Sequence, residues 1–400
     1  MSNVPDIRFK GFTDAWEQRK LVSMTNYKNG KGHEDKQSTI GKFELINLNS
    51  ISISGGLKHS GKFIDEADDT LQKDDLVMIL SDVGHGDLLG RVALIPEDDR
   101  FVLNQRVALL RPNATADPQF LFSYINAHQY YFKAQGAGMS QLNISKGSVE
   151  NFISFVPIIE EQKKIGTFFK QLDNTITLLQ RKIDNLNKVK KGLLQKLFPS
   201  EQSINPKIRF SGFNQDWEQR ELGDVAAIYD GTHQTPKYKD NGIMFLSVEN
   251  IKTLKSNKFI SNDDFEKEFK VYPQKDDVLM TRIGDIGTTN VVAMNDKLAY
   301  YVSLALIKSK YMQPYFLSYL ISSNAVQNDI WRRTLHIAFP KKINKNEIAK
   351  ISISKPSLEE QLQIGNLLKN IDDTITFLQK ELEMNKQVKK GFLQKLFPKE

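Results

Sequence analysis

The sequence predicts an α+β protein of two globular domains and two long antiparallel helices, arranged as an internal duplication with pseudo-two-fold symmetry. Three observations lead to this fold class. Two stretches occur twice in the same order, each half holds several short β-type runs, and two segments have apolar residues at helical spacing. At 400 residues, the chain also exceeds the size that one hydrophobic core usually supports.

The first repeated stretch opens each half of the chain. It reads IRFKGFTDAWEQRKL at residues 7–21 and IRFSGFNQDWEQREL at residues 208–222, with ten of fifteen positions identical. Trp16 and Trp217 stand at the same position of the two copies. Because identical aromatic residues in otherwise divergent halves suit a shared frame, we interpret both tryptophans as packing anchors.

Between the repeated stretches, each half has runs rich in β-branched and aromatic residues, which predict mostly antiparallel strands. The first half holds FELINL, DLVMIL, GRVALI and RVALL, and the second holds IMFLSV, DVLMTR, TNVVAM and YVSLALI. Each series ends in an aromatic segment with helical spacing, at residues 119–132 and 314–323. We therefore expect two α+β domains with one or two helices each.

The second repeated stretch closes each half. Residues 157–199 and 356–398 share 23 of 43 positions and end in VKKGLLQKLFP and VKKGFLQKLFP. Their apolar residues step alternately by four and three, which is the pattern of a coiled-coil seam. Prolines precede and close each run, so we expect two long helices. A single narrow apolar stripe on each helix predicts that the two pair with each other.

An antiparallel pairing is expected because only a short connection joins the two halves. The predicted parts are a first domain at residues 1–156, a spacer helix at 157–199, a linker at 200–207, a second domain at 208–355 and a C-terminal spacer helix at 356–400. Such a pairing relates the halves by a pseudo-two-fold axis, and the helices form a coiled-coil spacer of fixed length between the domains.

Composition limits the partners and the compartment. The net charge of +7, from 55 Lys and Arg against 48 Asp and Glu, permits a polyanionic partner but equally suits an ordinary basic protein. The sequence has no cysteine, no export signal and no apolar run of the roughly 20 residues needed to span a bilayer. We therefore expect a cytoplasmic protein without a membrane partner.

No motif predicts catalysis. The six histidines never fall at metal-ligand spacing, and neither a GxSxG elbow nor a Walker loop occurs. The stretch DDFEKEFK at residues 263–270 has the letters of a nuclease carboxylate cluster, but its mixed charges are typical of a solvated surface segment. The sequence thus predicts no catalytic residue and no metal site, and a hidden nuclease is the alternative.

The order of the repeated stretches carries a family resemblance. IRFxGFxxxWEQR, a variable body and PxxxEEQxxIG continuing to KKGxLQKLFP, all written twice, resemble the specificity subunits of type I restriction–modification enzymes. DGTHQTPKY at residues 230–238 and FLSVENI at 245–251 are similar to the opening of that family's target-recognition domains. The first half departs from this pattern, with YKNGKGHEDKQST at residues 27–39, which leaves residue-for-residue transfer between the halves open.

The resemblance implies a non-catalytic subunit with two target-recognition domains that reads a bipartite, asymmetric site on double-stranded DNA. It also implies two methyltransferase subunits, which use S-adenosylmethionine, and two restriction subunits, which use ATP and Mg²⁺. The cofactors would therefore belong to the partners and not to this chain. The alternative is a scaffold that bridges two copies of a partner protein and binds no DNA.

Polar loop side chains are the candidates for reading bases, and arginine to guanine is the commonest specific contact. In the second domain they are Thr232, His233, Gln234, Thr235, Lys237, Tyr238, Arg282, Arg332 and Arg333. In the first domain they are Lys28, Lys31, His33, His85, Gln141, Asn143 and Lys146. For each of them the alternative is an exposed side chain without a DNA contact.

Repeated residues should face something that is identical for both halves, and two copies of a methyltransferase subunit would be identical. The candidates for that contact are six lysines of the repeated helix ends: Lys190, Lys191, Lys196, Lys389, Lys390 and Lys395. Lysines near a helix C-terminus also complement the helix dipole, which is the alternative.

Overall fold

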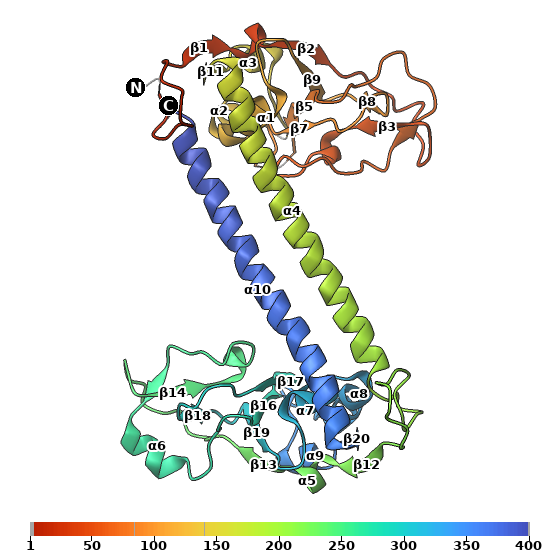
Figure 1. The fold of residues 1–400 in the computed structure, drawn as a ribbon, viewed down its shortest axis with the longest axis vertical. Helices are drawn as coiled ribbons and strands as arrows, with labels where there is room; N and C mark the ends of the chain where they lie inside the picture. The colour runs from red at the N-terminus through yellow and green to blue at the C-terminus, as the bar shows by residue number, and fades with distance from the viewer. Residues whose placement is uncertain (1–3, 84, 140, 399–400) are drawn as a thin grey trace. The chain divides into compact units, whose positions relative to one another are not determined.

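The computed structural model describes residues 4–83, 85–139 and 141–398, and the chain divides into two compact units. Unit 1 comprises Met1–Gln180 and Lys380–Glu400, and unit 2 comprises Arg181–Gln379. The helices α4 (Ile159–Lys196) and α10 (Leu358–Leu396) each contribute one part to unit 1 and the other part to unit 2 (Figure 1). Each predicted spacer segment is thus one helix that both units share.

Unit 1 is built on a four-stranded antiparallel sheet of order β2-β9-β5-β7 and a three-stranded sheet of order β4-β3-β8. Two-stranded pairs join β1 to β11 and β6 to β10. Within the three-stranded sheet, β3 and β8 are parallel. The strands are β1 (Glu17–Lys20), β2 (Thr25–Asn29), β3 (Phe43–Ile46), β4 (Phe63–Ile64), β5 (Leu76–Ile79), β6 (Ser81–Asp82), β7 (Val92–Leu94), β8 (Phe101–Leu103), β9 (Val107–Pro112), β10 (Leu142–Asn143) and β11 (Ile153–Val156).

The short helices of unit 1 are α1 (Pro118–Ala127), α2 (Gln129–Ala134) and α3 (Lys146–Glu150), with 3-10 turns at Leu21–Ser23 and Leu48–Ser50. The Asp117 side chain caps α1 by accepting a hydrogen bond from the Phe120 N–H at 2.8 Å. The predicted aromatic helix at residues 119–132 is two helices, because His128 leaves the helical conformation between them. With α3, the first body holds more helices than predicted.

Unit 2 repeats this plan. Its four-stranded sheet has the order β13-β19-β16-β17, its three-stranded sheet the order β15-β14-β18, and β12 pairs with β20. The strands are β12 (Glu218–Glu221), β13 (Ala227–Asp230), β14 (Ile243–Leu246), β15 (Phe259–Ile260), β16 (Val278–Ile283), β17 (Asp285–Val291), β18 (Leu298–Tyr300), β19 (Leu304–Lys308) and β20 (Ser352–Lys355). The helices are α5 (Leu222–Val225), α6 (Asn262–Glu268), α7 (Pro314–Ile321), α8 (Asn324–Arg333), α9 (Lys345–Ala349) and the 3-10 turn Val248–Asn250.

The repeated stretch at the start of each half forms part of the core, as predicted. Trp16 is buried in unit 1 and packs edge-to-face on Phe120, with ring centroids 6.0 Å apart. Trp217 is buried in unit 2 against Phe316, with centroids 5.7 Å apart. Both tryptophans therefore anchor the frame that the two units share.

Within each unit, the parts of α4 and α10 run antiparallel. In unit 1, Phe168 contacts Phe392 with ring centroids 4.9 Å apart, while Asp173, further along α4, meets Lys389, which comes earlier in α10. In unit 2, Lys190 meets Asp372, and the following turns of α4 share a core cluster with residues 364–368 of α10. Partner numbers fall along α10 as they rise along α4, which defines an antiparallel contact.

The start of each half also meets a helix end in the same way. The Ile7 N–H donates to the Lys395 carbonyl in unit 1 at 3.1 Å, and the Ile208 N–H donates to the Lys196 carbonyl in unit 2 at 3.0 Å. Lys196 and Ile208 are close in sequence, whereas Ile7 and Lys395 lie near the two ends of the chain. The chain therefore connects Lys196 to Ile208 through a short linker, whereas the equivalent contact of Lys395 with Ile7 is made by hydrogen bonding without such a linker.

Candidate nucleic-acid interface

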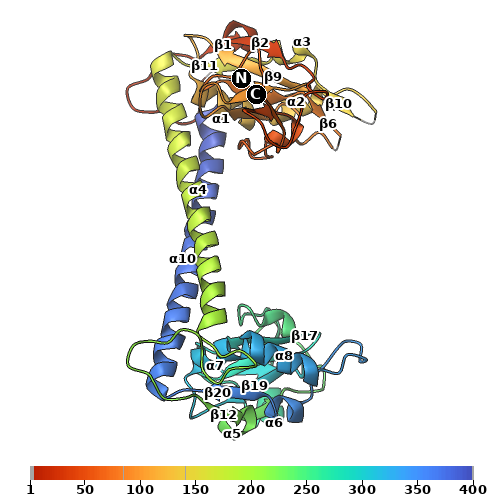
Figure 2. The ribbon, with the colours of Figure 1, turned by 90° about the vertical axis from the view of Figure 1, so that its right-hand side faces the viewer.

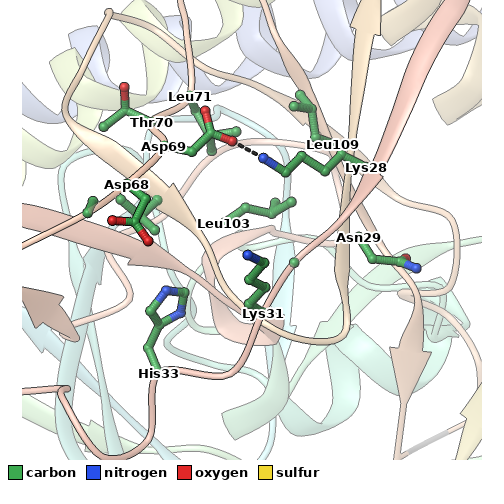
Figure 3. A pocket seen from close by; sticks show the side chains of 13 residues that line it. Lys28, Asn29, Lys31, His33, Asp68, Asp69, Thr70, Leu71, Leu103 and Leu109 are labelled. Atoms are coloured by element: carbon green, nitrogen blue, oxygen red, sulfur yellow. Dashed lines mark hydrogen bonds and ion pairs between the residues drawn. The ribbon is translucent and has the colours of Figure 1, made fainter.

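The end of β2 and the loop that follows it bring three predicted base-reading residues together. Lys28, Lys31 and His33 line one small cavity of about 70 Å³ in unit 1 (Figure 3). This volume is well below the roughly 300–1,000 Å³ of small-molecule sites, so the cavity is not a substrate pocket. Lys28 forms an ion pair with Asp69 across it, and His33 Nδ1 lies 3.4 Å from Asn104 Oδ1. A phosphate or base approaching Lys28 would have to compete with Asp69.

The loop after β13 carries most of the candidates in unit 2. His233, Gln234, Thr235, Lys237 and Tyr238 are all exposed on it. Thr232 instead donates a hydrogen bond to Glu268 at 2.9 Å and forms a parallel bridge with Tyr301, so it holds the base of the loop.

These two loops occupy equivalent places although their sequences do not align. Lys31 forms a parallel bridge with Asn104, directly after β8, as Thr232 does with Tyr301, directly after β18. Each loop opens on a glycine with no room for a side chain. A Cβ on Gly30 would lie 1.8 Å from the Asn104 carbonyl oxygen, and one on Gly231 would lie 2.4 Å from the Tyr300 carbonyl oxygen. The sequence signal for this equivalence is a glycine immediately after a strand in both halves.

Arg282 is a correction to the predicted set of exposed readers. Its side chain is only 7 % exposed, pairs with Asp230 and donates from Nε to the Ile343 carbonyl at 3.1 Å. Because its guanidinium is committed inside unit 2, Arg282 positions the end of β13, where the loop begins, and does not project toward a ligand. The sequence does not reveal this partner, since Asp230 lies 52 positions away.

Three further candidates of unit 1 lie in or beside the antiparallel pair of β6 and β10. His85 is exposed in the turn after β6. Asn143 accepts a hydrogen bond from Ser81 at 2.5 Å and donates to the Gln141 carbonyl at 3.1 Å, so its side-chain amide already has partners within unit 1. The Gln141 Nε2 atom is buried and has no hydrogen-bond partner within the described residues. Of the three, His85 is therefore the most available to a ligand.

Three further basic candidates already have partners in their own unit. Lys146 lies 3.5 Å from Glu150 and over the ring of Tyr27, and burial raises the pKa of Tyr27 to about 12. Arg332 lies 3.3 Å from Glu201, and Arg333 makes contacts with two carboxylates. Arg332 and Lys146 keep about half of their side chains exposed, while Arg333 keeps about a quarter.

The six repeated lysines divide into two groups. Lys389 pairs with Asp173 at 2.5 Å, and Lys190 pairs with Asp372 at 2.6 Å. These two lysines fasten α4 to α10 within a unit, so they are poor candidates for a partner contact. The remaining four are exposed and stay candidates: Lys191, Lys196, Lys390 and Lys395.

The repeated Glu-Glu-Gln of the second stretch proves to be a structural lock that the sequence did not assign. Arg8 makes two hydrogen bonds to the buried carboxylate of Glu161, at 2.6 and 3.0 Å, and Arg209 makes the same pair to Glu360, at 2.7 and 2.9 Å. These bonds raise the pKa of both arginines. The same contact in both units ties the first repeated stretch to the start of a long helix.

The described residues offer neither a metal site nor a membrane-spanning helix. Across residues 4–83, 85–139 and 141–398, no group of three or more His, Asp or Glu side chains is arranged to hold a metal ion. No helix within that same part of the chain is both long and apolar enough to cross a membrane.

Comparisons with known proteins agree with this architecture. Residues 13–188 and 214–386 each match the family described as the type I restriction modification DNA specificity domain. The type I restriction enzyme MjaVIII specificity subunit of Methanocaldococcus jannaschii is 27 % identical over 72 % of this chain and 71 % of its own length. The putative MjaX specificity subunit of the same organism is also 27 % identical, over 95 % of this chain and 92 % of its own.

A solved structure shares the fold. The crystal structure of the type I restriction-modification S subunit from M. genitalium aligns with a TM-score of 0.68 and 17 % identity, over 99 % of this chain and all of that one. The two family matches fall in the two halves of the chain, one in each copy of the duplicated plan, and together they cover most of it. This chain therefore belongs to the family of type I restriction-modification DNA specificity subunits.

Proposed function

We propose that this chain reads a bipartite, asymmetric site on double-stranded DNA, with one half-site for each unit and an unread gap between them. The proposal depends on a contrast between the two units: the ion pairs of their frame are repeated, whereas the loops that would face DNA are different. The contacts Arg8–Glu161 and Lys389–Asp173 of unit 1 recur as Arg209–Glu360 and Lys190–Asp372 in unit 2.

The loops mounted on this repeated frame are different. The loop that begins at Gly30 carries Lys31 and His33, whereas the loop that begins at Gly231 carries a run of polar residues that includes Gln234 and Lys237. A frame that repeats suits a partner that repeats, and loops that differ suit two different sequences. Unequal half-sites of DNA are such a target, because each base pair presents its own pattern of donors and acceptors in the major groove.

The antiparallel contacts in each unit support a pseudo-two-fold relation between the units. Duplex DNA has two-fold axes of the same kind, so two similar units can address opposite strands. A pair of helices about forty residues long, at about 1.5 Å per residue, would then hold the half-sites at a fixed distance and so define the gap. The helices would act as a rigid coiled-coil spacer in this arrangement.

The partners in this proposal are two methyltransferase subunits and two restriction subunits. This chain would contribute recognition, while S-adenosylmethionine, ATP and Mg²⁺ would bind to the partners, in the cytoplasm. Exposed apolar side chains at equivalent positions of the long helices support docking of identical partners, because such residues favour burial in an interface. These residues are Leu178 and Val189 on α4 and Phe377 and Val388 on α10.

Adenine-methylation mapping in a host with and without this gene, expressed with its methyltransferase partner, tests the proposal. The expected result is one methylated motif with two specified parts and a constant gap. The competing function, a scaffold without DNA contacts, predicts that the complex methylates without sequence preference or does not bind DNA in a gel shift. Either of these results would refute the proposal.

A further inference from the structure

The loop between α8 and α9 in unit 2 forms a hairpin that is pinned at its base. We call residues 335–342 the tip hairpin. The Leu335 N–H donates to the Lys342 carbonyl at 2.8 Å, which closes the hairpin. The Gly284 N–H donates to the Lys341 carbonyl at 2.8 Å, and the Ile343 N–H donates to the Arg282 carbonyl at 3.0 Å, which fix it beside β16. Figure 2 draws this loop, in blue near α8, reaching away from the sheet.

The end of the tip hairpin carries bare apolar side chains. Ile337 and Phe339 are both completely exposed, and Trp331 at the end of α8 is 65 % exposed. His336 packs on Trp331 with ring centroids 4.7 Å apart and so extends the apolar surface. Because these large apolar groups are not buried in the core of unit 2, they do not contribute to its stability. Exposed apolar surfaces of this kind commonly mark a binding site.

The positive charge around the tip hairpin favours a polyanionic partner. Residues 331–345 contain five Lys and Arg and no Asp or Glu. Lys341, Lys342 and Lys345 are exposed, and none of them forms an ion pair within the described part of the chain. Such a surface attracts a polyanion, and apolar side chains among cations are what a protein inserts against bases while its lysines contact phosphates.

The difference between the units favours DNA over a protein partner. Unit 1 has a hairpin with the same backbone pattern, in which Ala137 pairs with Asn143 and the Ile144 N–H donates to the Leu80 carbonyl at 2.8 Å. Its exposed apolar residue is Met139, and Ser140 lies outside the described residues. A common partner would meet the repeated helix surfaces, whereas this hairpin changes from one unit to the other.

We propose that Ile337 and Phe339 of the tip hairpin contact bases of the half-site read by unit 2, and that they are specificity-determining residues. They would make apolar contacts, against a thymine methyl group or the face of an unstacked base, and not hydrogen bonds. This inference rests on the proposed function, because it assumes that unit 2 faces DNA.

The test compares four forms of the full chain, each in complex with its methyltransferase partner: wild type, Ile337→Ala with Phe339→Ala, Tyr311→Ala and Met139→Ala. Methylation mapping of the double variant should show one half-site relaxed at one or more positions, with binding to the wild-type site weakened about tenfold. Tyr311 is an exposed aromatic residue of unit 2 outside the hairpin, so its variant should keep the wild-type motif. Met139→Ala should leave the half-site read by unit 2 unchanged.

Duplexes in which deoxyuridine replaces thymine in that half-site identify the contact. A methyl contact predicts weaker binding of the modified duplex by wild type and no further loss in the double variant. A contact with a base face predicts that wild type ignores the substitution while the double variant still binds weakly. Both results support the proposal.

Two results overturn it. The double variant could keep the wild-type motif and affinity, or it could lose the methyltransferase partner while keeping its DNA affinity, which would assign the hairpin to a protein contact. In both cases the wild-type complex still methylates its own motif, so the proposed function stands. A wild-type complex without any sequence preference would instead refute the proposed function itself, and this inference with it.

Discussion

Lys389 of α10 forms an ion pair with Asp173 of α4, with 2.5 Å between Nζ and Oδ1. Lys190 of α4 forms the equivalent pair with Asp372 of α10. The lysine is therefore on α10 in unit 1 and on α4 in unit 2, and the aspartate is on the other helix in each case. In unit 2 the contact is extended, because the Tyr319 hydroxyl donates to Asp372 Oδ2 at 2.6 Å. Burial and this hydrogen bond raise the pKa of Tyr319, which keeps the donor proton in place.

Charge reversal tests these pairs as fasteners of the helices. We expect Lys389→Glu to lower the free energy of unfolding by about 1 kcal/mol, since a partly exposed attraction becomes a repulsion, and Asp173→Lys in the same chain to restore most of it. Thermal unfolding of the two single variants and the double variant measures the coupling. Asp372→Asn should cost more than Asp173→Asn, because it also weakens the bond from Tyr319. Equal effects would contradict the difference between the units.

Loss of one arginine from the repeated locks should be among the most destabilising single changes. Arg209→Ala leaves the carboxylate of Glu360 buried and unpaired, for which we expect a loss of about 3 kcal/mol. Chemical denaturation with urea measures it. Arg100→Ala, which removes a half-exposed pair with Glu97, is the matched control and should cost less than about 1 kcal/mol. If Arg209→Ala were as mild as the control, the lock would have no structural role.

Arg282→Ala should act on one unit alone. It removes the partner of Asp230 at the end of β13, and we expect a stability loss of about 1–2 kcal/mol together with weaker reading of one half-site. Arg332→Ala, whose side chain is about half exposed, should change stability little. Methylation mapping combined with thermal unfolding separates the two effects. Relaxed reading of both half-sites in Arg282→Ala would argue against a local positioning role.

A circular permutant should fold. Because Ile7 and Lys395 are hydrogen-bonded in unit 1, a short peptide can join the two ends, and new ends can open in the linker at residues 200–207. Circular dichroism and the unfolding midpoint should be close to those of the original chain. An unfolded or aggregated permutant would show that the continuity of residues 196–208 is required and not just the joint that it makes.

Lengthening the helices should lengthen the gap. Four residues inserted after Lys182 and four after Glu381, at equivalent positions of α4 and α10, add about 6 Å to each helix. At 3.4 Å per base pair, the gap in the recognised motif should increase by about two base pairs. The control inserts residues in α4 alone, which shifts the lysines against their aspartates and should destabilise the chain. A methylated motif with an unchanged gap would contradict the spacer hypothesis.

Local periodicity in the sequence is sufficient to predict the two long helices and several of the central strands. The four-and-three spacing predicted helices at residues 157–199 and 356–400, where the structure has α4 and α10, and the β-type runs predicted the centres of β3, β5, β14 and β16. The positions of Trp16 and Trp217 in the repeat predicted their burial. These features depend on which face of a helix or strand is apolar, which neighbouring residues encode.

The roles of individual polar side chains were decided by the tertiary structure. The sequence predicts Arg282 as a base-reading residue, but its ion pair with Asp230, 52 positions away, holds it inside unit 2. It predicts Lys389 as a contact for a partner subunit, but Lys389 pairs with Asp173, 216 positions away. The equivalence of Gly30 and Gly231 also required the strands beneath them, because their loops share no sequence. A charged side chain has no periodic signature of its own, and its role depends on residues that only the fold brings near.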